Sequence, residues 1–387
     1  MEQKKKLLYI VRYQIYEDFN LKGKFDGQLA AFKNLGMDVY YLVFDKKYFY
    51  LVNGDNKEVV CRATTGLPMY FHTKVYYDMH RAVLKVLKKI RFDFAYWRGA
   101  PIWRSSCKVA KKLHSQGTKI LYEIPTYVKS GEKAMNGLRK LFSVYSDFWK
   151  PRLTKYFDLV VLIFTGDTTM DNLYGKPIAI IDNGVDVGAI PLRKPIIHEN
   201  EIHILALASM SYWHGYDRLI RSLSQYKGNV KIIIHMVGGN DGGLLPEWKQ
   251  LADDLGISDR VIFHGKMYGE DLAKMFDICD IGANALAQFR KNLSATSELK
   301  VREYTARGLP FLCSVEDPAL AHTDSPFWLK VANDESMLDM DEIVDFVLKM
   351  RADTQLSQRM RQYAFDYMTW EKQYAPLFDN LNDLKAE

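Results

Sequence analysis

The segment Lys231-Ile-Ile-Ile-His-Met-Val-Gly-Gly-Asn-Asp-Gly-Gly243 joins an apolar run of strand length to a glycine-rich loop. Residues 231–237 predict a buried strand, and the glycines after it allow a ligand to approach the backbone closely. Gly238 and Gly239 are adjacent, so the loop lacks the GxGxxG spacing of dinucleotide-binding proteins. Two interpretations of this segment therefore remain: a surface turn, or a ligand-binding loop that includes Gly239.

Strand-like and helical segments alternate on both sides of this stretch. In the first half we expect strands at 7–11, 39–44, 92–96, 119–123 and 159–164, with helices at 25–35, 82–90 and 107–114. In the second half we expect strands at 202–208, 231–237, 261–264, 278–283 and 311–314, helices at 216–226, 247–255, 271–276 and 299–307, and a long helical tail from Asp341. This alternation predicts an α/β protein with two Rossmann-like domains, whose parallel sheets are covered on both faces and face an interdomain cleft.

Composition excludes several classes of protein. The chain has 387 residues, of which 48% are hydrophobic and 13% aromatic, as in a folded globular protein of two domains. Its four cysteines form no CxxC pair, which argues against a disulfide scaffold or a zinc ribbon. We find no signal peptide and no run of about 18 apolar residues, and so expect a cytoplasmic protein.

The net charge of +6 is unevenly distributed. Residues 1–190 carry a net charge of +13 and the remainder −7, which suggests that the two halves meet different partners. The segment 129–155 is basic with interleaved aromatic residues, a pattern that suits an anionic membrane surface. A core-facing amphipathic helix is the alternative. Nucleic acid is not an expected partner, because the charge is spread out and no groove-binding motif is present. A nucleic-acid-binding protein with a basic surface is kept only as the non-enzymatic alternative.

The helix predicted at 299–307 follows small hydroxyl residues. The free backbone N–H groups of a helix N-terminus suit a diphosphate. Ser297 can cap the helix or bind a phosphate oxygen, Lys300 can add positive charge, and Glu303 can accept two ribose hydroxyls. An ordinary capped helix with a solvated glutamate is the alternative.

Four further segments carry a resemblance to a known family. They are Ile181-Asp-Asn-Gly-Val-Asp186, Trp213-His-Gly-Tyr-Asp-Arg-Leu-Ile220, the segment 255–266, and Arg302-Glu-Tyr-Thr-Ala-Arg-Gly-Leu-Pro310. In this order they resemble motifs of the family 4 retaining glycosyltransferases, which have the GT-B fold. Tyr122-Glu-Ile-Pro-Thr-Tyr127 resembles a loop of the bacterial polysaccharide-type members.

The resemblance implies domains at 1–185 for the acceptor and 186–365 for the nucleotide-sugar donor, with a final helix at 366–387 that returns to the first domain. It implies that Glu303 holds the donor ribose and that the backbone at Lys266 and Met267 reads the base. It also implies that the diphosphate lies beside Ser297, Leu299 and Lys300. Such enzymes hold the diphosphate without a bound metal, so we expect neither a metal nor a cofactor.

Two positions depart from the family pattern. The first glutamate of the family's E-x7-E motif falls at Ala295, and the diphosphate lysine is replaced by His214. We expect His214 to contact phosphate; the alternative is a helix-start residue packed against Trp213. These departures leave the identity of the donor open.

The acceptor is expected in the first domain. Gly23 follows the first strand, Arg98 follows the strand at 92–96, and Glu123 and Thr126 follow the next strand. Glu123 can orient an acceptor hydroxyl or act as a base, and a purely local structural role is the alternative.

The sequence therefore predicts a retaining hexosyltransferase of class EC 2.4. We expect a UDP- or GDP-sugar donor, a glycan or lipid-linked glycan acceptor, and a role in surface polysaccharide biosynthesis at the inner face of the membrane. We assign catalytic roles to Glu123, His214 and Lys300. A GT-B sugar-nucleotide epimerase is the alternative enzyme.

Overall fold

The computed structural model describes residues 4–14, 21–64, 71–99, 102–125, 138–164, 166, 170–240, 242–323 and 326–383. Contacts divide the chain into two compact units. The N-terminal unit comprises Met1–Ile181 together with Trp370–Glu387, and the C-terminal unit comprises Asp182–Thr369. The boundaries that we expected from the sequence, after residues 185 and 365, lie four residues from each of these crossings.

The N-terminal unit is built on a sheet that has nine strands within the described residues, in the order β4-β3-β2-β1-β5-β6-β7-β9-β8. Its strands are β1 (Lys6–Gln14), β2 (Asp38–Phe44), β3 (Tyr48–Asn53), β4 (Asn56–Arg62), β5 (Phe94–Arg98), β6 (Lys119–Ile124), β7 (Leu159–Ile163), β8 (Asn172–Leu173) and β9 (Lys176–Ile181). From β2 to β9 the neighbours are parallel. The two ends of the sheet are antiparallel.

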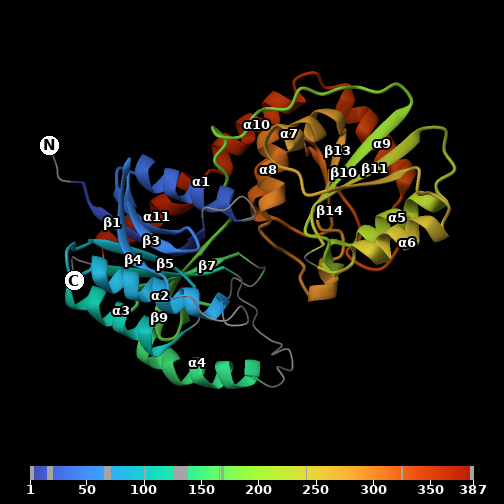
Figure 1. Ribbon diagram of the computed structural model, residues 1–387. Helices are drawn as coiled ribbons and strands as arrows, with labels where there is room; N and C mark the ends of the chain where they lie inside the picture. Colours follow the sequence, from blue (N-terminus) through green and yellow to red (C-terminus); the bar gives the residue numbers. More distant parts are fainter. Residues whose placement is uncertain are drawn as a thin grey trace. The chain divides into compact units, whose positions relative to one another are not determined.

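Helices cover both faces of this sheet (Figure 1). On one face lie α2 (Phe71–Val86), α3 (Arg104–Ser115) and α4 (Leu138–Thr154). On the other lie α1 (Lys22–Asn34) and α11 (Trp370–Asp383), which pack together through Phe32 and Tyr374, with ring centroids 4.7 Å apart. Alternate residues of β1 enter the two cores, as Leu8 packs on one face and Leu7 on the other.

The C-terminal unit has a wholly parallel sheet, with the order β12-β11-β10-β13-β14-β15 among the described residues. The strands are β10 (Glu201–Leu207), β11 (Lys231–Val237), β12 (Val261–Gly265), β13 (Ile281–Ala283), β14 (Phe311–Cys313) and β15 (Trp328–Lys330). One face is covered by α5 (Tyr216–Gln225), α6 (Leu245–Asp254) and α9 (Met340–Arg351), and the other by α7 (Gly269–Ile278), α8 (Leu299–Arg307) and α10 (Leu356–Tyr367). Short 3-10 turns lie at Tyr212–His214, Gln288–Lys291 and Pro318–Leu320.

The elements differ from the expectation in several places. The helix expected at 82–90 is α2, which ends at Val86. The strand expected at 278–283 is shortened to β13, because α7 runs to Ile278.

The hairpin of β3 and β4 was not expected: β4 is exposed and polar at most positions, whereas β3 carries a buried apolar run (Phe49, Leu51 and Val52) that was not recognised as a strand. The long helical tail is three helices, α9, α10 and α11, because the chain leaves helical geometry at 352–355 and again at 368–369. Within the described residues no helix combines the length and apolarity needed to span a membrane.

Candidate active site

The glycine loop after β11 is held close to the loop after β10. A Cβ at Gly238, whose φ is +141°, would lie 1.6 Å from the carbonyl oxygen of Ala208, so only glycine fits there. A Cβ at Gly239 would lie 2.2 Å from Cε of Lys266, which follows β12. The carboxyl ends of three parallel strands thus bring Gly239 and Lys266 together, and the following Met267 is half-buried.

His214 lies in the same set of loops. Gly215, with a φ of +65°, allows the turn before α5, where a Cβ would meet the backbone of Ala287 at 2.9 Å. The imidazole is buried, and its Nδ1 accepts the Ser211 backbone N–H at 3.0 Å. Burial, and then the positive charges of Lys300 and Lys291, lower the pKa of His214 to about 2. The ring is therefore neutral with its proton on Nε2, which makes it a fixed hydrogen-bond donor.

The first turn of α8 offers backbone amides and a cation. Glu298 is the N-cap residue, and no side chain among the described residues caps the turn. Nζ of Lys300 lies 3.3 Å from the hydroxyl of Tyr216. Burial lowers the pKa of Lys300 to about 8, although nearby Glu298 opposes the shift. Leu299 is partly exposed at the helix start. Anions are stabilised at such a helix end.

Ser297 is engaged by the segment that enters the unit. Its hydroxyl accepts the backbone N–H of Asn183 at 2.7 Å, and its carbonyl accepts the Asn183 side-chain amide at 2.5 Å. The residue is buried, so its hydroxyl anchors the segment around Asn183 to the start of α8. This contact favours a structural role for the Ser297 side chain over the diphosphate contact that we expected.

Glu303 lies further along α8. One carboxylate oxygen accepts Nε of Arg307 at 3.0 Å, and the side chain is 27% exposed. The Arg307 guanidinium also lies over the ring of Phe276, 4.3 Å from its centroid. This packing holds the helix face in place and leaves the Glu303 carboxylate partly accessible.

A carboxylate lies at the start of α8, although not at the position of the first glutamate of the E-x7-E pattern. Ala295 pairs with Glu316 in an isolated bridge and brings no carboxylate to the helix start. Glu298 instead accepts a hydrogen bond from the amide of Gln288 and acts electrostatically on Lys300. By spacing, Glu298 does not match the first glutamate of the motif. Its place at the N-cap of α8, near Lys300, could not be predicted from that spacing.

Glu123 is fully buried at the end of β6 in the N-terminal unit. Its carboxylate accepts the Tyr96 hydroxyl at 2.8 Å and the Gln28 amide at 3.3 Å. Arg98 forms an ion pair with it, and Nζ of Lys24 lies 4.0 Å away. Burial alone would raise the pKa of Glu123, but the two cations and the two donors together lower it.

This network changes the role that we give Glu123. An ionised carboxylate with no exposed surface accepts hydrogen bonds but does not reach a substrate. Its position fits the alternative of a local structural role, in which it orients Arg98, better than the catalytic role expected from the sequence. Burial lowers the pKa of Lys24 to about 8, and the charge of Glu123 opposes that shift.

Arg98 contributes to a pocket of about 70 Å³. A second guanidinium, from Arg12 on β1, lies on the same pocket. The other lining residues are Val11, Leu21, Phe25, Tyr76 and Gly99. Two guanidiniums on an otherwise largely apolar wall suit an anionic group.

The other two residues expected on the acceptor side are Gly23 and Thr126. Gly23 lies exposed in the first turn of α1 and not in a glycine loop, and a Cβ there would meet open space. Thr126 lies outside the described residues.

Lys24 and Gln28 were missed by sequence reasoning. They lie four residues apart on the same buried face of α1 as Phe25, Leu29 and Phe32. Two polar side chains within an apolar helical stripe were the signal, because such groups are buried only when they have partners.

Comparisons with known proteins support one fold and one class of enzyme. Residues 192–366 match the family described as Glycosyl transferases group 1. No curated protein matches the chain. Among solved structures, sucrose-phosphate synthase from Thermosynechococcus elongatus is 14% identical with a TM-score of 0.65, over 99% of this chain and 100% of that one.

Two further structures are similar over nearly their whole length. HepE of Anabaena, solved in complex with UDP and glucose, is 12% identical with a TM-score of 0.57, over 98% of this chain and 100% of that one. The lipopolysaccharide outer core galactosyltransferase WaaB is 12% identical with a TM-score of 0.57, over 97% and 99% of the two chains. The expected GT-B fold is confirmed. The family match and the fold together support a glycosyltransferase, a transferase of class EC 2.4.

Proposed function

We propose that the protein is a retaining glycosyltransferase that moves a sugar from a nucleotide-sugar donor, bound by the C-terminal unit, to a glycan or lipid-linked glycan acceptor. The observation that carries this proposal is the uncapped first turn of α8, with Lys300 in that turn and the Nε2 donor of neutral His214 near it. The departure of a nucleoside diphosphate builds up negative charge. Fixed amide dipoles and a cation stabilise that charge most in the transition state.

The rest of the donor has partners in the same loops. Glu303 is assigned to the ribose hydroxyls, since its carboxylate is partly exposed on α8. The backbone at Lys266 and Met267 is assigned to the base, and Gly239, which lies against the Lys266 side chain, is assigned to the same part of the donor site. The structure of HepE with UDP and glucose supports a nucleoside diphosphate sugar as the donor class. We keep both UDP- and GDP-sugars as candidates.

The acceptor is assigned to the pocket of the N-terminal unit. Arg12 and Arg98 on its wall favour an acceptor that carries phosphate or another anionic group, such as a lipid-diphosphate-linked glycan. The name of WaaB, a lipopolysaccharide galactosyltransferase, agrees with a role in surface polysaccharide biosynthesis.

A thermal-shift experiment tests the donor site. At a ligand concentration one hundred times Kd, binding adds about 2.7 kcal/mol to the unfolding free energy of the wild-type protein. We expect UDP, GDP or one of their sugars to raise Tm by several degrees. Lys300→Ala and Glu303→Ala should remove most of that shift, and the matched variant Asp345→Ala, an exposed carboxylate on α9, should retain it.

Either of two results would contradict the donor assignment. One is a wild-type protein that responds to none of these nucleotides. The other is a nucleotide response that survives both Lys300→Ala and Glu303→Ala. Product analysis with the nucleotide-sugar that binds then tests retention, because the anomeric configuration of the transferred sugar must equal that of the donor.

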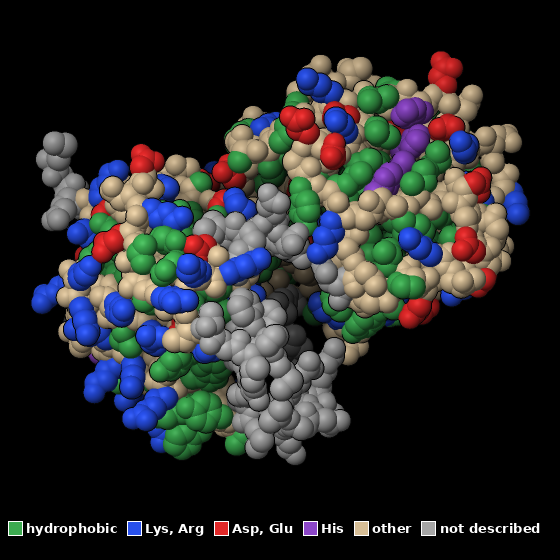
Figure 2. Space-filling model, in the orientation of Figure 1, with side chains coloured by type: hydrophobic (Ala, Val, Ile, Leu, Met, Phe, Trp, Pro, Cys, Tyr) green, Lys and Arg blue, Asp and Glu red, His purple; other side chains and the backbone are tan. Residues whose placement is uncertain are grey.

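We further propose that α4 contacts an anionic membrane surface. Three of its hydrophobic side chains, Val144, Tyr145 and Phe148, are 61%, 44% and 55% exposed. Arg152 lies over the Phe148 ring at 4.0 Å, and Lys155 is exposed nearby. Figure 2 shows this hydrophobic patch beside Lys and Arg side chains, where Figure 1 places α4. Such exposure opposes the core-facing alternative; residues 129–137 lie outside the described residues.

Vesicle flotation tests the membrane contact. The wild-type protein should float with vesicles that contain an anionic phospholipid at low salt, and less so at high salt, because salt screens the attraction. Phe148→Ser should reduce flotation, whereas Val59→Ser, a change at a 55% exposed residue of β4, should not. Absence of flotation at low salt would remove this part of the proposal.

A further inference from the structure

Three histidines form a hydrogen-bonded row across neighbouring strands of the C-terminal unit. Nδ1 of His203 on β10 lies 2.8 Å from Nε2 of His235 on β11. Nδ1 of His235 lies 2.9 Å from Nε2 of His264 on β12. Figure 2 shows histidine side chains as a continuous stripe on the surface of this unit. None of these residues belongs to the proposed transfer site.

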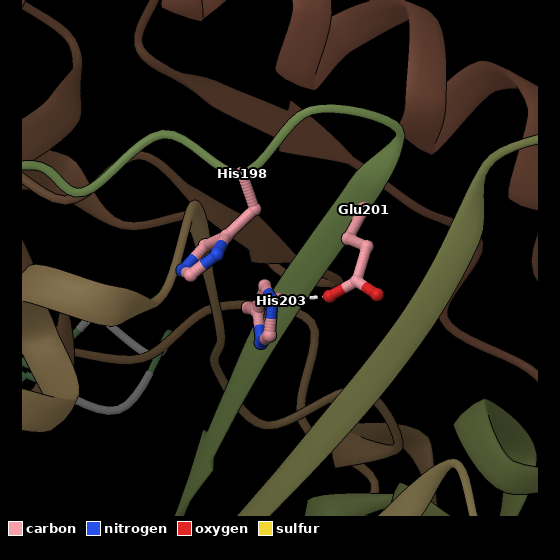
Figure 3. Close-up of side chains that lie close together, drawn as sticks. All are labelled: His198, Glu201 and His203. Carbon is pink, nitrogen blue, oxygen red and sulfur yellow. Dashed lines mark ion pairs between the residues drawn. The ribbon is translucent and has the colours of Figure 1, made fainter.

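One end of the row meets two further side chains of types that ligate metals, His198 and Glu201 (Figure 3). His198, Glu201 and His203 each offer a ligand atom, and these atoms all lie within 4.8 Å of one another. Oε2 of Glu201 lies 3.4 Å from Nε2 of His203. For a tetrahedral ion with bonds of about 2.0–2.1 Å, neighbouring ligand atoms are about 3.3 Å apart.

The imidazole nitrogens at this end lack other partners. His203 is 6% exposed, and among the described residues its buried Nε2 has only the Glu201 carboxylate nearby, at 3.4 Å, without the geometry of a good hydrogen bond. Nε2 of His198 is also buried without a hydrogen-bond partner within the described part of the chain. A buried polar atom without a good partner is costly, and the two rings that carry these atoms lie close together, with centroids 4.4 Å apart, so the pair calls for an explanation.

We propose that His198, Glu201 and His203 bind a divalent transition-metal ion, with Zn²⁺ as the best fit. Two imidazoles and one carboxylate are ligands that zinc accepts, and they leave a fourth position for water. Glu201 can bind through Oε2 and keep its ion pair with Lys231, because Nζ of Lys231 lies 2.9 Å from the other oxygen, Oε1.

The histidine row explains how His203 is prepared for this ion. A metal on Nε2 of His203 requires its proton on Nδ1, from which it donates to Nε2 of His235. His235 then carries its own proton on Nδ1 and donates to His264. Imidazole ligands of metals usually donate their other ring N–H to an acceptor that orients the ring, and here His235 provides that acceptor. Binding of the ion therefore fixes the tautomers of His203 and His235.

The position of the site separates it from sugar transfer. Glu201 begins β10, whereas the glycine loops and α8 lie at the carboxyl ends of the strands. The seven residues of β10 span about 23 Å at 3.3 Å per residue. His198 lies in the segment before β10, so the ion ties this segment to the sheet. We expect it to stabilise the C-terminal unit and to take no part in the transfer reaction.

Calorimetry on the full chain tests the proposal. After treatment with a chelator and dialysis, the wild-type protein should bind one Zn²⁺, and Zn²⁺ should raise Tm. His203→Gln, His198→Gln and Glu201→Gln should each weaken binding by roughly a hundredfold, and His322→Gln, a change at an exposed histidine of the same unit, should leave it unchanged. His235→Leu removes the acceptor for Nδ1 of His203 and should weaken binding by about 10–100-fold.

His235→Gln keeps an acceptor oxygen and should bind Zn²⁺ more tightly than His235→Leu does. Because His203 is buried and its variant can fail to fold, the partly exposed Glu201 provides a second test, with far-ultraviolet circular dichroism as the control for folding. The proposal is overturned if the wild-type protein binds no Zn²⁺, or if folded Glu201→Gln and His198→Gln bind it as tightly as the wild type does.

Discussion

At the scale of single residues, the buried cluster around Glu123 shows how the N-terminal unit holds two cations inside an apolar core. The side chains of Lys24 and Arg98 are only 5% and 13% exposed, and Glu123 is completely buried. Charges removed from water are costly unless they are paired and hydrogen-bonded. The carboxylate supplies that pairing for both cations, and in doing so it fixes Arg98 at the pocket.

We predict that Glu123→Gln destabilises the protein by about 3–5 kcal/mol, because the neutral amide leaves two buried cations without a compensating charge. Urea denaturation should show the loss as a lower midpoint. Glu58→Gln is the matched control: Glu58 pairs with Lys89, but the two side chains are 65% and 71% exposed, so the cost should stay below about 1 kcal/mol. Equal midpoints for wild type and Glu123→Gln would show that the cluster does not depend on the charge.

At the scale of elements, the sequence predicted the parts of the fold that apolar patterns determine. The strand at 231–237 and the helix at 299–307 have the bounds that we expected, since each is a clear apolar run or periodic segment bounded by glycine. The hairpin at 48–62 was missed. Most residues of β4 are exposed and polar, so no hydrophobic alternation marks it as a strand, whereas β3 carries buried apolar residues by which it could have been recognised.

The candidate site was only partly predictable, because its geometry depends on contacts between distant loops. Spacing alone placed Lys300 and Glu303 on one helix, as the structure shows. Spacing could not show that the backbone N–H of Asn183, 114 residues away, donates to the Ser297 hydroxyl. It also could not show that the backbone N–H of Ser211 fixes the tautomer of His214. The Asn183 contact is set by the packing of segments far apart in the sequence, to which no local pattern corresponds, whereas the Ser211 contact is local and spans three residues at the start of a 3-10 turn.

At the scale of the whole molecule, the chain passes between its two units twice, at 181–182 and at 369–370. The second crossing separates two neighbouring helices. Met360 of α10 is buried in the core of the C-terminal unit, and Tyr374 of α11 is buried in the core of the N-terminal unit. Residues only 14 positions apart therefore stabilise different units.

We predict that Tyr374→Ala and Met360→Ala weaken different units of the same chain. Each change removes a fully buried side chain, at a cost of about 3–5 kcal/mol for the tyrosine and about 2–5 kcal/mol for the methionine. Hydrogen exchange measured by mass spectrometry should show the difference. Tyr374→Ala should speed exchange in β1 and α1, and Met360→Ala should speed exchange in α8, each with little change in the other unit. Faster exchange across both units in either variant would mean that the two cores unfold as one, against the division that the contacts show.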